Sequence, residues 1–186
     1  TTVTNMIADV IEASGKTVAC NRTGANMAYG VAATLLQTEP ADWGVFESDE
    51  LWLARILPQV KATYVVLLNL FRDQLDRCGE IDRVQDAIIS GLEHSPESTL
   101  IYNADDPLCA IIAEKAENRA IAFGVSEDMH LAQNTVADAQ MCQRCSGMFT
   151  YDYRQYGQLG TYHCENCGFA RPELDVHAHN CLLYTS

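Results

Sequence analysis

Hydrophobic positions along the chain follow two alternating periods. Short apolar runs of the kind that form strands alternate with segments whose apolar residues recur at helical spacing. The expected strands are Thr17–Asn21, Trp43–Glu47, Thr63–Asn69, Thr99–Asn103 and Ala120–Val125. The expected helices are residues 1–13, Asn26–Gln37, Asp49–Leu57, Ile81–Leu92 and Pro107–Glu117. This alternation predicts an α/β fold of βαβ units with a mostly parallel sheet covered on both faces. The third strand is almost entirely apolar, as a strand buried on both faces should be.

Polar side chains follow four of the expected strands. Glu47 ends the second strand and Asn69 ends the third, while the stretches "NRTGAN" and "NADDP" end the first and the fourth. In open parallel sheets, ligands bind beyond the carboxyl ends of the strands. Acidic and amide groups gathered there need cations, which a phosphate-bound Mg²⁺ would supply. The alternative is that these residues form turns and helix caps, and Asp106 before Pro107 is by itself better explained as a cap.

The first expected helix begins at the first residue of the sequence. A helix that follows a phosphate-binding loop begins Gly-Lys-Ser/Thr, where the lysine reaches the phosphates and the hydroxyl binds Mg²⁺. Thr1 would be that hydroxyl if Gly-Lys preceded it. Since the sequence contains no such lead-in, the residues alone leave this role of Thr1 a guess.

Composition narrows the class of protein. The chain has 186 residues, 48% hydrophobic and 20% charged, which is typical of one globular domain with a small appendage. A net charge of −13 argues against a nucleic-acid partner, because phosphate binding needs Lys and Arg. No apolar run is long enough for a transmembrane segment. Four of the eight cysteines form two C-x-x-C pairs, which favours a metal site in a reducing compartment over disulfides.

Those two pairs predict a structural zinc site. The ligands would be Cys142, Cys145, Cys164 and Cys167, at the spacing C-x₂-C-x₁₈-C-x₂-C. Four thiolates close a zinc tetrahedron and leave no position for water. Gly147 and Gly168 would allow the turns of two knuckles, and "MFTYDY" with "TYHC" would form the hairpin of a ribbon. A dithiol redox pair or buried free cysteines are the alternatives, but a redox motif needs only one pair.

Five stretches, in this order, resemble the central ATP-binding domain of Mur ligases. They are "TTVTNMIADVIEASG", "NRTGANMAYGVAATLL", "FESDE", "NLFRDQLDRCGEIDRV" and "NADDP". The fourth is the most specific and is similar to the MurT-type subfamily, the ligase subunits of lipid II isoglutaminyl synthases. The resemblance covers about residues 1–178, and a four-cysteine insert within the central domain is also a feature of that subfamily.

The resemblance implies roles for five residues. In the family a T-G-T-N-G-K loop precedes the first helix, so Thr1 takes the position of the Mg²⁺-binding threonine. Glu47 matches the glutamate that ligates Mg²⁺, and Asn69 matches the asparagine that ends the next strand. Asn26 lies in the loop that approaches phosphate and substrate. Gln74 stands where peptide-adding Mur ligases have a metal-binding His, and MurT-type chains have Gln there as well.

Two further positions differ from the peptide-adding ligases or from the subfamily. The carbamylated lysine of Mur peptide ligases would fall near Ile89, where this chain has no lysine. MurT-type chains lack that lysine too, which favours the same subfamily. Cys78 stands where the subfamily is expected to have Tyr.

The resemblance implies an ATP-dependent carbon–nitrogen ligase of peptidoglycan synthesis. ATP would phosphorylate the D-glutamate α-carboxylate of lipid II, and ammonia from a GatD-like glutaminase partner would form the amide at the cytoplasmic face of the membrane. Mg²⁺ and ATP would bind at Thr1, Asn26 and Glu47. A chain without the preceding loop and later domains would be inactive alone. The alternatives are a zinc-ribbon binding module without chemistry, or another Mur or folylpolyglutamate-type ligase.

The expected organisation has four parts. Residues 1–138 would be the ATP-binding domain, cut just after its phosphate loop, and residues 139–172 the zinc ribbon. Residues 173–178 would begin the return to the central domain. Residues 179–186 end in "CLLYTS", which fits no part of the pattern and is expected to be a non-native tail.

Overall fold

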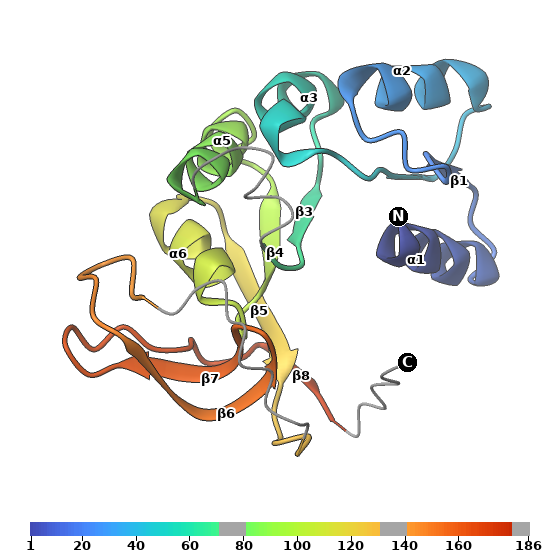
Figure 1. Ribbon diagram of the computed structural model, residues 1–186. Coiled ribbons are helices and arrows are strands. Elements are labelled where there is room, and N and C mark those ends of the chain that lie inside the picture. The colour runs from blue at the N-terminus through green and yellow to red at the C-terminus, as the bar shows by residue number, and fades with distance from the viewer. Residues whose placement is uncertain (71–80, 131–140, 180–186) are drawn as a thin grey trace.

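The computed structural model of the chain describes residues 1–70, 81–130 and 141–179. Its helices are α1 (Thr2–Ala13), α2 (Ala28–Gln37), the 3₁₀ helix η1 (Glu50–Trp52), α3 (Leu53–Val60), α5 (Ile81–Glu93) and α6 (Pro107–Lys115). Its strands are β1 (Val18–Cys20), β2 (Trp43–Val45), β3 (Tyr64–Leu67), β4 (Thr99–Asn103), β5 (Ala120–Val125), β6 (Phe149–Tyr156), β7 (Leu159–Cys164) and β8 (Val176–Ala178). The predicted α/β architecture is confirmed, with strands and helices alternating as expected (Figure 1).

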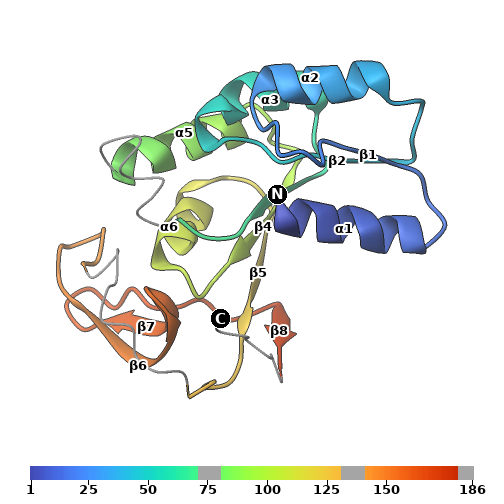
Figure 2. The same cartoon turned by 45° about the vertical axis from the view of Figure 1, so that its right-hand side comes forward.

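The parallel strands pair in two groups instead of one. One sheet has the order β3-β4-β5-β8, all parallel, and a second contains only β1 and β2, also parallel. Both views show α1, β1, β2 and α2 to one side of the four-stranded sheet (Figures 1 and 2). Among the described residues no strand pairing joins the two groups, so the expected single sheet is present as two separate pieces.

The expectation that the third strand is buried on both faces is wrong. Val65 and Leu67 pack against the core, whereas Tyr64 and Val66, on the opposite face, are 49% and 43% exposed. Side chains alternate between the two faces of a strand, so this pattern means that only one face is covered. The reason is that the core against which β3 packs lies on the α5–α6 side of the sheet, so the side chains on the opposite face remain exposed.

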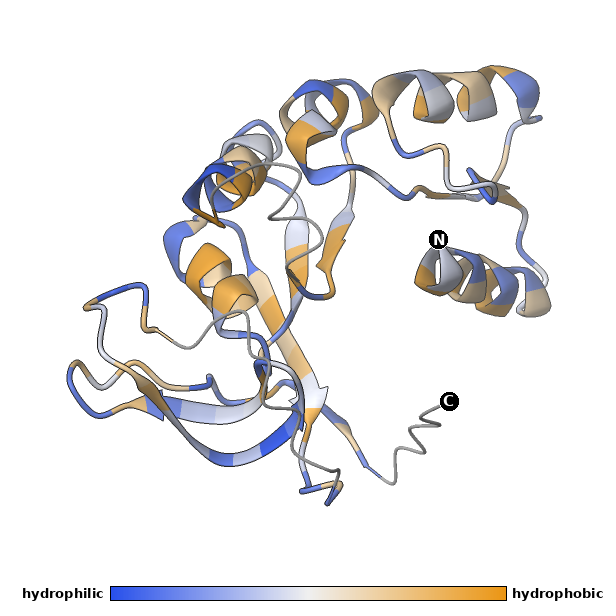
Figure 3. Cartoon of the chain, viewed as in Figure 1, coloured by the Kyte–Doolittle hydropathy of each residue, from blue (hydrophilic) through white to orange (hydrophobic). Residues whose placement is uncertain are grey.

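The core of the four-stranded sheet is formed mainly by α5, α6 and β4. Val84, Ile88 and Leu92 repeat every four residues along α5 and are at most 1% exposed. They cluster with Leu100 of β4 and Leu108 of α6. Helical spacing thus places one apolar stripe against the sheet. Figure 3 shows this apolar layer in α6 and β3, whereas the β6–β7 hairpin is mostly hydrophilic.

The four cysteines belong to a small antiparallel unit inserted between β5 and β8. Its strands β6 and β7 pair from Phe149↔Cys164 to Tyr156↔Leu159, which confirms the expected hairpin. After the insert the chain returns to the main sheet, where β8 pairs in parallel with β5. The boundaries at residues 139–172 and 173–178 remain predictions. Within the described ranges, every helix is too short or too polar to cross a bilayer.

Candidate functional site

Three of the residues predicted to bind Mg²⁺ and ATP lie together. Glu47 follows β2, and its Oε2 atom is 2.7 Å from the α-amino nitrogen of Thr1. The Thr1 hydroxyl and the Asn26 side chain also hydrogen-bond to the Glu47 carboxylate. Burial alone would raise the pKa of Glu47, but these bonds and the neighbouring positive charge outweigh it and lower the pKa below its usual value. The cluster therefore places a carboxylate beside a hydroxyl and an amide.

Asn21 holds this cluster in shape and was not predicted from the sequence. It follows β1 and is 3% exposed. Its Oδ1 accepts a hydrogen bond from the Glu47 backbone N–H at 2.8 Å, and its Nδ2 donates to the Glu47 carbonyl at 2.8 Å and to the Ala25 carbonyl at 2.9 Å. One side chain thus joins the ends of two strands to the following loop. An asparagine before a glycine turn is so common that the sequence offered only a weak signal.

The loop after Asn21 lies against the first helix. Gly24 has a φ of +76°, and a Cβ atom there would lie 2.5 Å from the Thr1 hydroxyl oxygen. Arg22 binds α1 through ion pairs of 2.7 Å to Asp9 and 2.9 Å to Glu12. Glycine is required both for the left-handed backbone and for the close approach. The hydroxyl of Thr1 and the carboxylate of Glu47 are oxygen donors of the kind Mg²⁺ takes, so this cluster fits that ion chemically.

Of the other two residues that the resemblance implies to be catalytic with Glu47, Asn69 lies away from this cluster, and the position of Gln74 is not described. Asn69 follows β3, which belongs to the four-stranded sheet, whereas Glu47 follows a strand of the two-stranded sheet. Gln74 and Cys78 lie outside the described residues. The structure therefore brings Thr1, Asn26 and Glu47 together, and Asn69 stands at the end of a different sheet.

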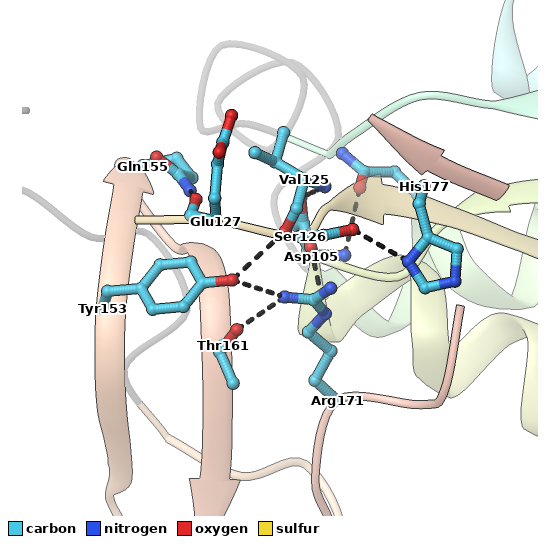
Figure 4. A network of polar contacts seen from close by, with 10 residues as sticks. Asp105, Val125, Ser126, Glu127, Tyr153, Gln155, Thr161, Arg171 and His177 are labelled. Atoms are coloured by element: carbon cyan, nitrogen blue, oxygen red, sulfur yellow. Dashed lines mark hydrogen bonds and ion pairs between the residues drawn. The ribbon is translucent and has the colours of Figure 1, made fainter. Parts of the chain in front are cut away.

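Asp105 and Asp106, the acidic pair of "NADDP", make contacts that stabilise the fold. Asp106 caps α6 by accepting the Leu108 N–H at 2.9 Å, and it also accepts the Leu70 N–H at 2.9 Å. It is fully buried, and burial raises its pKa to about 6. Asp105 accepts the Val125 N–H at 2.8 Å and pairs with Arg171 (Figure 4). These contacts favour the capping interpretation over a cation site.

The four predicted cysteine ligands converge on one point. Their Sγ atoms all lie within 4.8 Å of one another. The Cys142–Cys167 and Cys145–Cys164 sulfur pairs are 3.6 and 3.5 Å apart. A tetrahedral zinc ion with Zn–S bonds of about 2.3 Å needs sulfurs about 3.8 Å apart. The cluster could hold a metal, and its donors and dimensions fit zinc.

Two turns of the same design carry these cysteines. The N–H of Ser146 donates to the Cys142 carbonyl at 2.7 Å, as the N–H of Gly168 does to the Cys164 carbonyl at 2.9 Å. Ser146 and Gly168 have φ values of 59° and 74°, so Ser146, and not Gly147 as predicted, adopts the left-handed conformation in the first turn. Gly147 leaves little room for a side chain, because a Cβ there would lie 3.1 Å from the Asn166 Cβ and 3.3 Å from the sulfurs of Cys145 and Cys164.

Hydrogen bonds in these turns also act on the thiols. The Asn166 side chain and the Gly147 backbone N–H bond to the sulfur of Cys145 and lower its pKa to about 6. The thiolate is the form that binds metal. These bonds favour the thiolate of Cys145, whereas burial raises the pKa of Cys142, in the same turn, to about 12.

Comparisons with known proteins agree with this architecture. The family described as the Mur ligase middle domain matches residues 1–168. The MurT subunit of lipid II isoglutaminyl synthase (glutamine-hydrolyzing) from Staphylococcus aureus is 35% identical over 93% of the chain. The same subunit from Streptococcus pneumoniae is 35% identical over 85% of it. The chain spans only 40% and 36% of the lengths of these two relatives.

More distant proteins share the fold. A UDP-N-acetylmuramoylalanine–D-glutamate ligase from Nitrobacter winogradskyi is 28% identical over 67% of the chain, which covers 28% of that protein. The solved structure of a pseudomurein peptide ligase type C from Methanothermus fervidus superimposes with a TM-score of 0.75 at 22% identity. The match covers 95% of this chain and 35% of that one. With the βαβ order, the strand-end cluster and the family match over residues 1–168, these findings show that the chain belongs to the Mur ligase family, through its middle domain.

Proposed function

We propose that this chain is the nucleotide-binding part of a ligase that amidates lipid II. The complete protein would use ATP to convert the D-glutamate α-carboxylate of the stem peptide into an amide, giving D-isoglutamine. Support comes from the 35% identity to two MurT subunits, whose names specify a glutamine-hydrolyzing lipid II isoglutaminyl synthase. Because the chain spans two fifths or less of those relatives, the activity belongs to the complete protein.

The main observation in support of the proposal is that polar side chains from separate segments meet at Glu47. A carboxylate, a hydroxyl and a side-chain amide from three segments meet there. An anion at the end of a parallel strand, beside the first turn of a helix, can hold a cation that neutralises phosphates. Capping does not explain Glu47, because the helix that follows is capped by Asp49.

The proposed roles follow from these positions. Bound ATP with Mg²⁺ supplies the phosphoryl group that activates the substrate carboxylate. Glu47 and the Thr1 hydroxyl would hold the metal, and Asn21 would keep the Glu47 backbone in place through its two hydrogen bonds. Asn26 would orient the Glu47 carboxylate. Asn69 and Gln74 would act on the substrate side of the phosphates.

The four-cysteine cluster would hold a structural Zn²⁺. Four sulfur ligands leave no open position, so this metal would take no part in the chemistry. Its proposed role is to stabilise the insert, whose hairpin is short and mostly hydrophilic (Figure 3).

A second subunit completes the proposed reaction. Ammonia would come from a GatD-like glutaminase, because the relatives are named as subunits of a glutamine-hydrolyzing enzyme. Lipid II is membrane-bound, so the complex would work at the cytoplasmic face of the membrane. Nucleic acid is not an expected partner, given the net charge of −13.

Reconstitution tests the proposal. The complete protein that contains this chain is purified with its glutaminase and supplied with lipid II, glutamine and ATP. We expect mass spectrometry to find the amidated stem peptide only when ATP and Mg²⁺ are both present. Formation of a new peptide bond to an added amino acid, instead of an amide, would identify a peptide-adding ligase and refute the proposed reaction.

A further inference from the structure

The cysteine-bearing insert reaches across the sheet to the residue after Asn69. Gln158 lies in the turn between β6 and β7, and its Nε2 donates a hydrogen bond of 2.8 Å to the Leu70 carbonyl. The contact joins residues 88 positions apart in sequence. On the other side of Leu70, Asp106 accepts its N–H at 2.9 Å. Both backbone polar groups of Leu70 are therefore bound to side chains.

These two bonds orient the peptides on either side of Leu70. The Leu70 N–H belongs to the same planar group as the Asn69 carbonyl, since a peptide bond is rigid. Binding that N–H therefore sets the ψ angle of Asn69. The Leu70 carbonyl belongs to the next peptide plane and is held by Gln158. Burial of the Leu70 side chain, 2% exposed, anchors the residue but does not by itself orient these planes.

Gln158 is itself held by the insert. It is completely buried, and burying a primary amide is unfavourable unless it is bonded. Its Nε2 is bonded to Leu70, whereas its Oε1 has no hydrogen-bond partner among the described residues. Its side chain also interacts with Asp106. The Tyr151 hydroxyl donates to the Gln158 carbonyl at 3.0 Å, and the Gly160 N–H donates to the Asp105 carbonyl at 3.0 Å. The tip of the hairpin is thus joined to the "NADDP" loop through Gly160 and the Gln158 side chain, and Tyr151 fixes the Gln158 backbone within the hairpin.

We propose that Gln158 is a positioning residue that holds the Asn69–Leu70 corner in place, so that the insert braces one edge of the ligase site. This inference rests on the proposed function only in giving Asn69 a part in the reaction. The brace itself is a claim about contacts, and it can be measured without any substrate.

The test compares two buried glutamines of the same hairpin. Gln158→Met keeps the volume and removes the amide. Gln155→Met is the matched control, because Gln155 is 6% exposed and donates to the Glu127 carbonyl at 2.7 Å instead of to Leu70. Amide hydrogen exchange of the 186-residue chain is followed by NMR at Leu70 and, as a reference, at Leu100, whose N–H bonds the Arg119 carbonyl.

We expect Gln158→Met to speed exchange at Leu70 roughly tenfold relative to Leu100. The substitution frees the Leu70 carbonyl and removes a contact of Asp106, which accepts the Leu70 N–H, and one buried hydrogen bond is worth about that factor. Gln155→Met should leave the ratio unchanged. Tyr151→Phe removes only the hydroxyl that holds the Gln158 carbonyl, and it should give a smaller change in the same direction if Gln158→Met does not fold. An unchanged ratio in Gln158→Met, or in Tyr151→Phe where that is the variant measured, overturns the brace.

A kinetic measurement tests the link to the reaction. In the complete enzyme, Gln158→Met should lower kcat roughly tenfold and change the KM for ATP less than twofold, because the affected corner is not part of the Glu47 cluster. Altered exchange with normal kcat would refute the positioning role and leave the amidation intact. An inactive wild-type enzyme would refute the proposed function, while the exchange result would still stand.

Discussion

Asp105 and Arg171 form an ion pair that is nearly closed to solvent. The Nε of Arg171 lies 3.2 Å from Oδ1 of Asp105, and the two side chains are 10% and 5% exposed. Arg171 also donates to the Tyr153 and Thr161 hydroxyls at 3.3 and 2.5 Å (Figure 4). The pair joins the inserted hairpin to the end of β4, so it connects the cysteine-bearing insert to the four-stranded sheet.

Replacing Arg171, the positively charged member of this pair, should strongly lower the free energy of unfolding of the chain. Arg171→Met leaves the Asp105 carboxylate buried without its partner, and loss of one member of a buried pair costs about 3–5 kcal/mol. Urea unfolding followed by circular dichroism measures the difference. Arg22→Met is the control, because Arg22 pairs with Asp9 and Glu12 at the surface, where ion pairs contribute little. Equal losses in the two variants would contradict a special role for the buried pair.

The cysteine cluster should bind one zinc ion per chain. Elemental analysis of reduced, chelator-free protein measures the metal content, and Cys145→Ser should abolish it, because a hydroxyl is a much poorer zinc ligand than a thiolate. Exchange protection across residues 142–170 should fall as well. Cys20→Ser is the control, since Cys20 lies in β1, outside the cluster, and this variant should keep its metal. Wild-type protein without bound metal would refute the site.

Asp106 should make folding stability depend on pH. Its pKa is about 6 in the folded chain and near 3.8 when unfolded, so the folded state binds the extra proton between these values. The contribution of Asp106 to the free energy of unfolding should therefore fall, by on the order of 1–3 kcal/mol, as pH rises from about 4 to 6. Asp106→Asn should lose this dependence. The wild type and Asp106→Asn carry the same cysteines, so the difference between their profiles of stability against pH isolates the effect of Asp106. Parallel profiles would contradict the raised pKa of Asp106.

Loss of Glu47 should impair catalysis in the complete enzyme. Glu47→Ala removes the charged oxygen donor of the strand-end cluster, and loss of such a metal ligand should cost on the order of 10²-fold in rate. Glu50→Ala, three residues away, is the control and should stay near the wild-type rate. Turnover is measured at limiting Mg²⁺, where a metal defect is largest. Near-normal turnover of Glu47→Ala there would show that the metal assignment is wrong.

Gln74 should not serve as a ligand of a second metal. A neutral amide is a poorer Mg²⁺ ligand than a carboxylate, so Gln74→Ala should slow the complete enzyme only modestly, and Gln74→His should not improve it. Steady-state kinetics of the two variants measures this. A nucleotide-bound structure with a second Mg²⁺ coordinated directly by Gln74 would reopen the peptide-ligase alternative.

The order of elements could be predicted from the sequence because it depends on local periodicity. The strands around Ile101 and Ala122 and the helix around Ile88 lie where the apolar spacing placed them. The cysteine cluster was also predictable, since the spacing of two C-x-x-C pairs nearly specifies their convergence. The family resemblance, carried by consecutive motifs, was visible for the same reason.

Only the tertiary structure decided which long-range contacts hold the site. The bond from Gln158 to Leu70 spans 88 positions, and no local pattern marks a glutamine in a hairpin turn for that role. Nor did the sequence reveal that Asn21 ties the Glu47 backbone to the next loop, or that Val66 faces solvent. Periodicity records which side of an element is apolar. What covers that side, and which polar groups meet across it, depends on how distant segments pack.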